Sequence, residues 1–197
     1  MKIAIFVSLI ATLGQSVSLQ RGVPSEQGAV ARSAECTANL PPQILKLLQA
    51  NYSQWRIQTL SDLSPAARRS WDYKKYWKPN ECPGVAIGQF EARETSYALL
   101  IVPKEHPDSG YKLLAFARAK NTGDYKERVL EVSDKPGASD ALIRKTKTGG
   151  FFDARSRKQF ASSALDAILF LESGTKQFGA ELYFWTAAGY RHEPVEY

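Results

Sequence analysis

The sequence predicts one α+β domain, a twisted antiparallel sheet of about seven to nine strands with two short N-terminal helices. Before residue 80, two stretches open with proline and carry apolar residues at helical spacing. From residue 83 onward, apolar runs and period-two alternation recur between turn-forming residues, which is typical of strands. We place this single domain at 39–197, because the chain is long enough for one hydrophobic core and short for two.

The N-terminus has the pattern of a secretory signal peptide. A positively charged start precedes a mostly apolar run over 3–13, and small residues follow at Ser16 and Ser18, the spacing that signal peptidase recognises. The run is too short for a membrane span, which needs about 20 apolar residues. We therefore predict a signal peptide over 1–18 and a flexible leader over 19–38. The mature product is expected in the periplasm or outside the cell.

Cysteine count and net charge limit the compartment and the partners. In an oxidising compartment, Cys36 and Cys82 favour one structural disulfide over a reactive or intermolecular thiol. The formal net charge of +6 permits attraction to anionic lipid headgroups, wall polymers or nucleic acid. Export makes nucleic acid an unlikely partner among these, and nothing after the signal peptide resembles a membrane span.

Two helices are expected before the strands begin. The first opens with Pro41–Pro42, because proline suits the first turn of a helix, and it ends near Asn51. The second is capped by Ser64, has Pro65 at its first position and is stopped by Pro79.

The strands follow from alternation and from short apolar runs. Runs 97–102 and 167–171 are apolar on both faces, which is typical of central strands covered on both sides. Each run is followed by a turn and a partner strand, so the sequence shows two similar hairpins, expected in one twisted sheet. The segments predicted as strands are 55–59, 83–90, 97–102, 111–117, 125–132, 167–171, 181–186 and 190–194. The polar, glycine-bearing stretch 133–159 offers two weaker candidates, 141–144 and 150–153.

One stretch resembles a known repeat. Residues 82–100, Cys-Pro-Gly-Val-Ala-Ile-Gly-Gln-Phe-Glu-Ala-Arg-Glu-Thr-Ser-Tyr-Ala-Leu-Leu, resemble a degenerate FG-GAP or VCBS-type repeat. In that family a strand ending Gly-Asp-Phe leads into an Asp-rich calcium loop. Here Gln89 and Ser96 stand where the repeat carries Asp, and Arg93 falls inside the loop. Since calcium prefers six to eight oxygen ligands, mostly carboxylates, we expect a plain hairpin connection and no metal or cofactor. The layout as a whole resembles that of secreted bacterial proteins.

Four aromatic residues form the candidate binding group. Aromatic side chains supply binding energy at interfaces and on sugar rings. On a helix three of them share one face and could equally pack against the sheet. The group is Trp71, Tyr73, Tyr76 and Trp77.

No catalytic residue is predicted. His106 lies in a turn and His192 in a late strand, and neither adjoins a nucleophile-elbow pattern. No zinc spacing, phosphate loop or dinucleotide fingerprint is present in the sequence. Asp166 and Glu181 border the late strands and are the carboxylate pair to inspect for glycoside hydrolysis.

A basic stretch interleaves cations with aromatic residues. Arg144, Lys145 and Lys147 precede Phe151–Phe152, and three more cations follow over 155–158. Such a patch could hold phosphate or stack on bases, whereas charge runs in loops are usually solvated.

These observations favour an exported, non-catalytic binding or interaction module whose partner is an envelope or extracellular protein or glycan. The alternatives are an envelope polysaccharide hydrolase and an inhibitor or immunity-type protein of an envelope enzyme. A cleft holding two acids within about 10 Å of each other would favour the hydrolase. The positive charge argues against a partner that is itself strongly basic.

Overall fold

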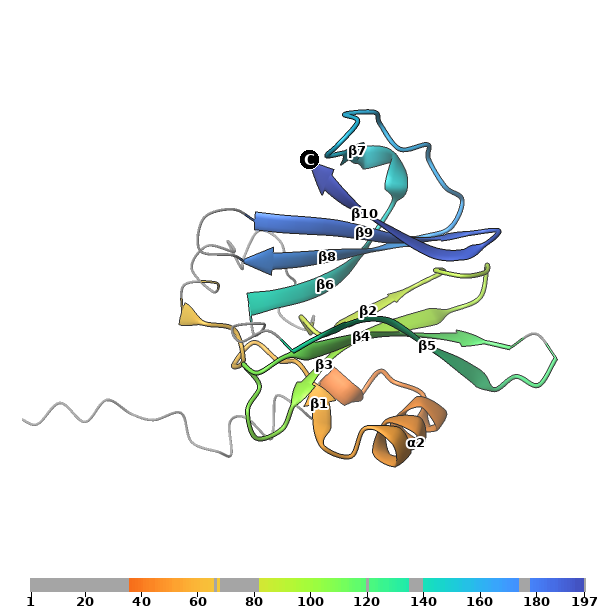
Figure 1. Ribbon diagram of the computed structural model, residues 1–197. Helices are drawn as coiled ribbons and strands as arrows, with labels where there is room; N and C mark the ends of the chain where they lie inside the picture. Colours follow the sequence, from red (N-terminus) through yellow and green to blue (C-terminus); the bar gives the residue numbers. More distant parts are fainter. Residues whose placement is uncertain are drawn as a thin grey trace, which may run out of the picture.

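The structure is a computed structural model that describes residues 36–65, 67, 82–119, 121–134, 140–173 and 178–196. Over these ranges the chain forms ten strands in two antiparallel sheets that stack face to face (Figure 1). The elements are α2 (Pro42–Asn51), β1 (Trp55–Ile57), β2 (Val85–Gly88), β3 (Ser96–Pro103), β4 (Tyr111–Arg118), β5 (Tyr125–Ser133), β6 (Ala141–Thr146), η2 (Thr148–Gly150), β7 (Phe152–Asp153), β8 (Ala167–Ser173), β9 (Phe178–Thr186) and β10 (Gly189–Glu196).

The α+β class expected from the sequence is therefore wrong. The strands are divided between two sheets, and the described residues contain one complete α-helix and one complete 3-10 helix. Strands that are apolar on both faces need cover on both sides. The inner face of each sheet is covered by the other sheet, as in a β-sandwich, and not by helices.

The second predicted helix is described only at its start. The Ala67 backbone N–H donates to Ser64 Oγ at 3.1 Å, so Ser64 is a helix N-cap, as predicted, with Pro65 next. Ser64 is itself held by Asp140, whose carboxylate accepts from the Ser64 backbone N–H at 2.8 Å and from its hydroxyl at 2.9 Å. The rest of this predicted helix lies outside the described residues, as do the predicted signal peptide and most of the leader.

The first sheet is built on the β3–β4 hairpin. Its order is β1-β3-β4-β5, and β2 also pairs with β3. The outer edge of β3 is shared, because β1 lies opposite its second half and β2 opposite its first half. β5 forms the other edge, with a β-bulge between Leu113 and Leu114 of its partner strand.

The second sheet is built on the β8–β9 hairpin and has the order β6-β8-β9-β10-β7. Both predicted hairpins are thus present, but they belong to different sheets rather than to one. The connections β2–β3, β4–β5 and β9–β10 all lie at the same end of the sandwich, on the right of Figure 1. We call this the hairpin end.

The inner core fills the space between the sheets, and each outer face has its own cover. α2 lies on the outer face of the first sheet, where fully buried Ile44 joins Leu99, Ile101 and Phe116. The outer face of the second sheet packs against Leu63, Ala67 and Phe151. The inner core comprises Ala86, Phe90, Ala98, Leu100, Val102, Tyr111, Leu113, Ala141, Ile143, Ile168, Phe170 and Tyr183.

β2 joins the two sheets along one side of the sandwich. Before β2, the carbonyl of Pro83 accepts from the Ile143 backbone N–H at 2.9 Å. After β2, the Asp166 backbone N–H donates to the Gln89 carbonyl at 2.9 Å. Gly84 permits the close approach of this segment to the chain after β1, since a Cβ there would lie 2.6 Å from the Gln58 carbonyl oxygen. The sandwich is therefore closed on the β2 side.

A disulfide joins Cys36 to Cys82, as predicted, with the two Cα atoms 5.4 Å apart. It ties the segment before α2 to the residue that leads into β2. Among the described residues, no helix has the length and apolar character needed to cross a bilayer.

Candidate functional site

A cleft of about 400 Å³ opens at the hairpin end, where β2 meets β6 and the start of β8. A volume of roughly 300–1,000 Å³ is typical of small-molecule sites. The lining residues are Ile87, Gly88, Gln89, Thr95, Lys145, Lys147 and Asp166.

Strand alternation brings the two lysines into the cleft. On β6, Ala141 and Ile143 face the inner core, and successive side chains in a strand point to opposite faces. Lys145 and Lys147 continue the same side of the chain to the point where the core ends. The sequence thus places two ammonium groups at the mouth of the space between the sheets.

Both carboxylate oxygens of Asp166 are engaged. Oδ1 lies 2.7 Å from Lys147 Nζ, and Oδ2 accepts from the Gln89 backbone N–H at 2.9 Å. Burial favours the neutral acid, but the hydrogen bonds from Lys147 and Gln89 and the charge of Lys145 outweigh it and lower the pKa of Asp166. Asp166 is therefore an ionised anchor for β2.

Lys145 differs from Lys147 in having no ion-pair partner among the residues that the structure describes. Its side chain is exposed on the cleft side of β6. Two lysines and one aspartate leave the lining with a net charge of +1. The electrostatic character of the cleft is cationic.

Gly88 is needed for the close approach of β2 to Asp166. A Cβ at this position would lie 2.8 Å from the Phe90 ring and 3.0 Å from Asp166 Oδ2. Phe90 is fully buried in the inner core beside the cleft. A larger residue at position 88 would displace either the ring or the carboxylate.

A second group of contacts fastens the β2–β3 loop to the opposite side of the hairpin end. Arg128 Nε donates to the Glu91 carboxylate at 2.8 Å, and its guanidinium lies 4.7 Å from the Trp185 ring centroid. The Trp185 ring meets Tyr190 edge-on at 5.1 Å. Burial raises the pKa of the Tyr190 hydroxyl, which has no hydrogen-bond partner within the described part of the chain. Because Glu91 is paired with Arg128, its carboxylate is occupied.

Glu131 links the sheets through two buried tyrosines. Tyr111 of β4 donates to Glu131 Oε1 at 2.6 Å, and Tyr183 of β9 donates to the other oxygen. Glu181 Oε2 lies 3.2 Å from the same Tyr183 hydroxyl. Burial and the adjacent Glu131 carboxylate raise the pKa of both tyrosines. Nothing in the sequence pattern singled out this cluster.

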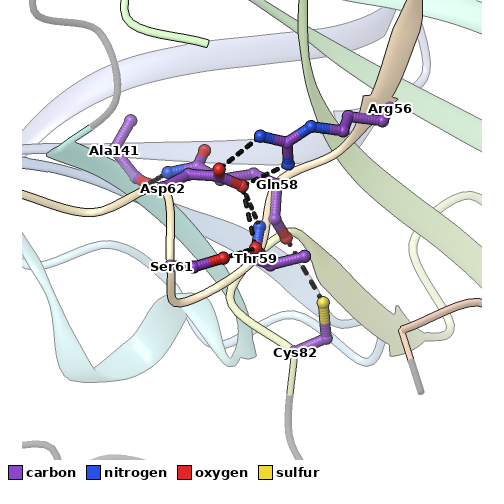
Figure 2. A network of polar contacts seen from close by, with 7 residues as sticks. All are labelled: Arg56, Gln58, Thr59, Ser61, Asp62, Cys82 and Ala141. Atoms are coloured by element: carbon purple, nitrogen blue, oxygen red, sulfur yellow. Dashed lines mark hydrogen bonds and ion pairs between the residues drawn. The ribbon is translucent and has the colours of Figure 1, made fainter. Parts of the chain in front are cut away.

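A third polar network lies between β1 and β6 (Figure 2). Arg56 forms an ion pair with Asp62, whose carboxylate also accepts from the Thr59 backbone N–H at 2.7 Å and from its hydroxyl at 2.9 Å. Gln58 is fully buried, and its amide donates to the Ala141 carbonyl at 2.7 Å. These contacts hold the segment after β1 against β6, so we regard the network as structural.

The residues that the sequence offered for inspection as catalytic groups are not brought together. Asp166 lies one residue before β8, whereas Glu181 pairs with Phe170, four residues further along. This register separates the two acids by about 13 Å along the strand direction. His106 lies in the β3–β4 turn and His192 packs against the Tyr183 ring at 5.3 Å, and neither lines the cleft.

The basic stretch is divided between two places. Lys145 and Lys147 line the cleft, while the cations over 155–158 lie on an exposed loop between β7 and β8. Phe151 is buried against the second sheet, but Phe152 remains 43% exposed. The interleaved cations and aromatics therefore do not form one continuous surface.

The aromatic candidate binding group, Trp71, Tyr73, Tyr76 and Trp77, lies outside the described residues, and its role stays a prediction.

Comparisons with protein-family models, with curated proteins and with solved structures found no match for this chain. The resemblance of 82–100 to an FG-GAP or VCBS-type repeat therefore stays a prediction.

Proposed function

We propose that this chain is an exported, non-catalytic binding module that holds a small ligand in the cleft between β2 and β6. The observation that carries the proposal is the cleft itself, with about 400 Å³ of space and an unpaired ammonium group among the described lining residues. The partner is a small molecule or the end group of an envelope or extracellular glycan or protein.

Export is supported by two features. The N-terminus has the charged start, the apolar run and the small residues of a signal peptide. The Cys36–Cys82 disulfide is expected to persist in the periplasm or outside the cell rather than in a reducing cytosol. The product is a mature protein that begins at Leu19.

A binding role suits the cleft better than catalysis does. A general base or nucleophile needs a lone pair facing the substrate, which a carboxylate or an imidazole supplies and an ammonium group does not. Both oxygens of Asp166, the single acid among the described lining residues, are already hydrogen bonded, and both histidines of the chain lie elsewhere. The lysines remain to hold a ligand.

Export is tested by expressing the full chain with a C-terminal tag and measuring the intact mass of the product. The expected mass corresponds to loss of residues 1–18 and of the two hydrogens removed by the disulfide. An intact Met1 together with two alkylatable thiols would contradict export.

Binding is tested with a panel of neutral and charged small molecules, observed by backbone amide NMR of the mature protein. We expect ligands to shift the Gly88 and Gln89 amides, which lie in the cleft. Thr95→Trp should block these shifts by filling the exposed mouth. Thr122→Trp, in the exposed β4–β5 turn, is the matched control and should leave them unchanged. No shift with any member of the panel would contradict the binding role.

A polysaccharide hydrolase is the second candidate, and one observation favours it. Glu131 and Glu181 both contact the Tyr183 hydroxyl, so they lie within about 6 Å of each other, close to the separation in retaining glycosidases. Neither acid lines the cleft, and Glu131 is held by two tyrosines. Hydrolysis of an envelope glycan that is lost in Glu181→Gln would favour the enzyme over the binding module.

A further inference from the structure

We propose that the ligand of the cleft between β2 and β6 carries an oxyanion, a carboxylate or a phosphoryl group, which Lys145 and Lys147 bind. This inference rests on the proposed function and names the chemical class of the ligand.

The polar groups of the lining are mostly donors. An ammonium group offers three N–H donors and no acceptor. Lys147 donates one hydrogen bond to Asp166 at 2.7 Å and one to the Ala164 carbonyl at 3.2 Å, so one N–H donor remains for a ligand. Lys145 has no ion-pair partner in the described ranges, and the Thr95 hydroxyl adds a further donor at the exposed rim. These donors call for an acceptor that carries negative charge.

Other ligand classes fit the lining less well. No aromatic side chain of the described residues lines the cleft, so these residues offer neither a sugar ring nor a base a stacking surface there. The net charge of +1 opposes a cation. Recognition in this cleft therefore depends on charge, with Ile87, which is 37% exposed, beside the lysines to contact an uncharged part of the ligand.

Asp166 sets the strength of this interaction. Its carboxylate lies 2.7 Å from Lys147 Nζ, so it neutralises Lys147 and places a negative charge next to one of the two groups that would bind the oxyanion. It therefore weakens binding of an anion while it holds β2 in place. Removing its charge and keeping its shape should strengthen binding, which a merely structural role would not produce.

The experiment is an NMR titration of the mature protein with three probes: inorganic phosphate, glucuronate and glucose. Glucose is the uncharged counterpart of glucuronate. We expect phosphate, glucuronate or both to shift the Gly88 and Gln89 amides, with affinity that falls as salt is raised, and no shift with glucose. Comparison of the two anions separates a phosphoryl ligand from a carboxylate ligand.

Three variants decide the residues involved. Lys145→Gln should weaken binding of the anion about tenfold or more, because it removes a charged hydrogen bond. Lys46→Gln, on exposed α2, makes the same change in net charge and should have no effect. Asp166→Asn should strengthen binding about tenfold, because it removes a negative charge next to the anion.

The outcomes separate this inference from the proposed function. Shifts of the cleft amides with glucose as strong as those with glucuronate would overturn the oxyanion class and leave the binding module standing. Equal loss in Lys145→Gln and Lys46→Gln would overturn the assignment to the cleft and leave only a general charge effect. Absence of shifts with all three probes overturns the inference, and absence with the whole panel described above overturns the proposed function as well.

Discussion

The Glu131 contacts between the sheets allow a quantitative prediction. Tyr111 and Tyr183 are 3% and 2% exposed, and each donates a hydrogen bond to one oxygen of Glu131. A hydrogen bond to a charged group contributes roughly 1.5–3 kcal/mol. We therefore expect Tyr111→Phe and Tyr183→Phe each to lower the free energy of unfolding by about 2 kcal/mol.

The double variant should cost more than the sum of the two. After one tyrosine is replaced, the remaining hydroxyl still satisfies the half-buried carboxylate and bonds to it more strongly. After both are replaced, Glu131 loses both donors, and an unpaired buried charge is strongly destabilising. We expect a coupling free energy of about 1–2 kcal/mol between the two positions.

The assay is urea unfolding at pH 7, followed by tryptophan fluorescence, with the m-value checked for constancy. Tyr190→Phe is the matched control. It removes a buried hydroxyl that has no hydrogen-bond partner among the described residues, so it should raise the free energy of unfolding by about 1 kcal/mol. The reasoning is refuted if the two Tyr→Phe effects at Glu131 add within about 0.5 kcal/mol, or if Tyr190→Phe costs as much as either.

Three further predictions concern the stability of the sandwich. Burial raises the pKa of Tyr111, Tyr183 and Tyr190, so above pH 10 these hydroxyls ionise in the unfolded chain but stay protonated in the folded protein. The free energy of unfolding should therefore be constant below about pH 10 and fall above it by up to about 1.4 kcal/mol per pH unit for each tyrosine. Urea midpoints measured between about pH 8 and 11.5 should fall accordingly, and a flat profile would contradict this. Replacing Cys36 and Cys82 by alanine removes a disulfide between residues 46 positions apart in the sequence. Because the disulfide restricts the unfolded chain, its loss should lower the free energy of unfolding by about 4 kcal/mol. A loss under about 1 kcal/mol would contradict this reasoning from chain entropy. Gly84→Ala should lower the free energy of unfolding by about 2–3 kcal/mol, because its Cβ would lie 2.6 Å from the Gln58 carbonyl oxygen. Gly150→Ala, which has open space around it, should change that free energy by no more than about 0.5 kcal/mol. Equal effects of the two variants would refute the steric argument.

Local patterns were sufficient to place most elements. Apolar residues over 97–102 and 167–171 identified the central strands β3 and β8, and the turn residues after them identified both hairpins. The first helix begins with proline and ends at Asn51, as its sequence predicts. These features depend on neighbours in the chain, which a sequence pattern records directly.

The arrangement of the strands in layers was not accessible in the same way. A strand that is apolar on both faces gives the same pattern whether a helix or a second sheet covers it. The pairing of β6 with β8, and of β1 with β3, joins segments far apart in the chain. The strands themselves were therefore predicted correctly, and the error in fold class concerns which element covers each face of the sheet.

The candidate site shows the same division. The lysines of the basic stretch were visible as charges, and alternation along β6 accounts for the side on which they emerge. The lysines become part of a cleft because β2 lies opposite them. β2 is held there by backbone hydrogen bonds that the carbonyls of Pro83 and Gln89 accept from the second sheet and from Asp166. The Glu131 cluster was missed for a similar reason, because its members come from three strands in two sheets.

The position of β2 also bears on how the cleft would bind. Both ends of β2 are hydrogen bonded to the second sheet, at Ile143 and at Asp166, while its length pairs with β3 in the first. The groups that line the cleft are thus held by strands and by an ion pair before any ligand arrives. A site of this kind loses little conformational freedom on binding, so a modest number of charged contacts can give measurable affinity. Since these bonds position the lining residues of β2, a change that displaces β2 should also change the cleft. Gly84→Ala should therefore weaken ligand binding, although Gly84 does not itself line the cleft.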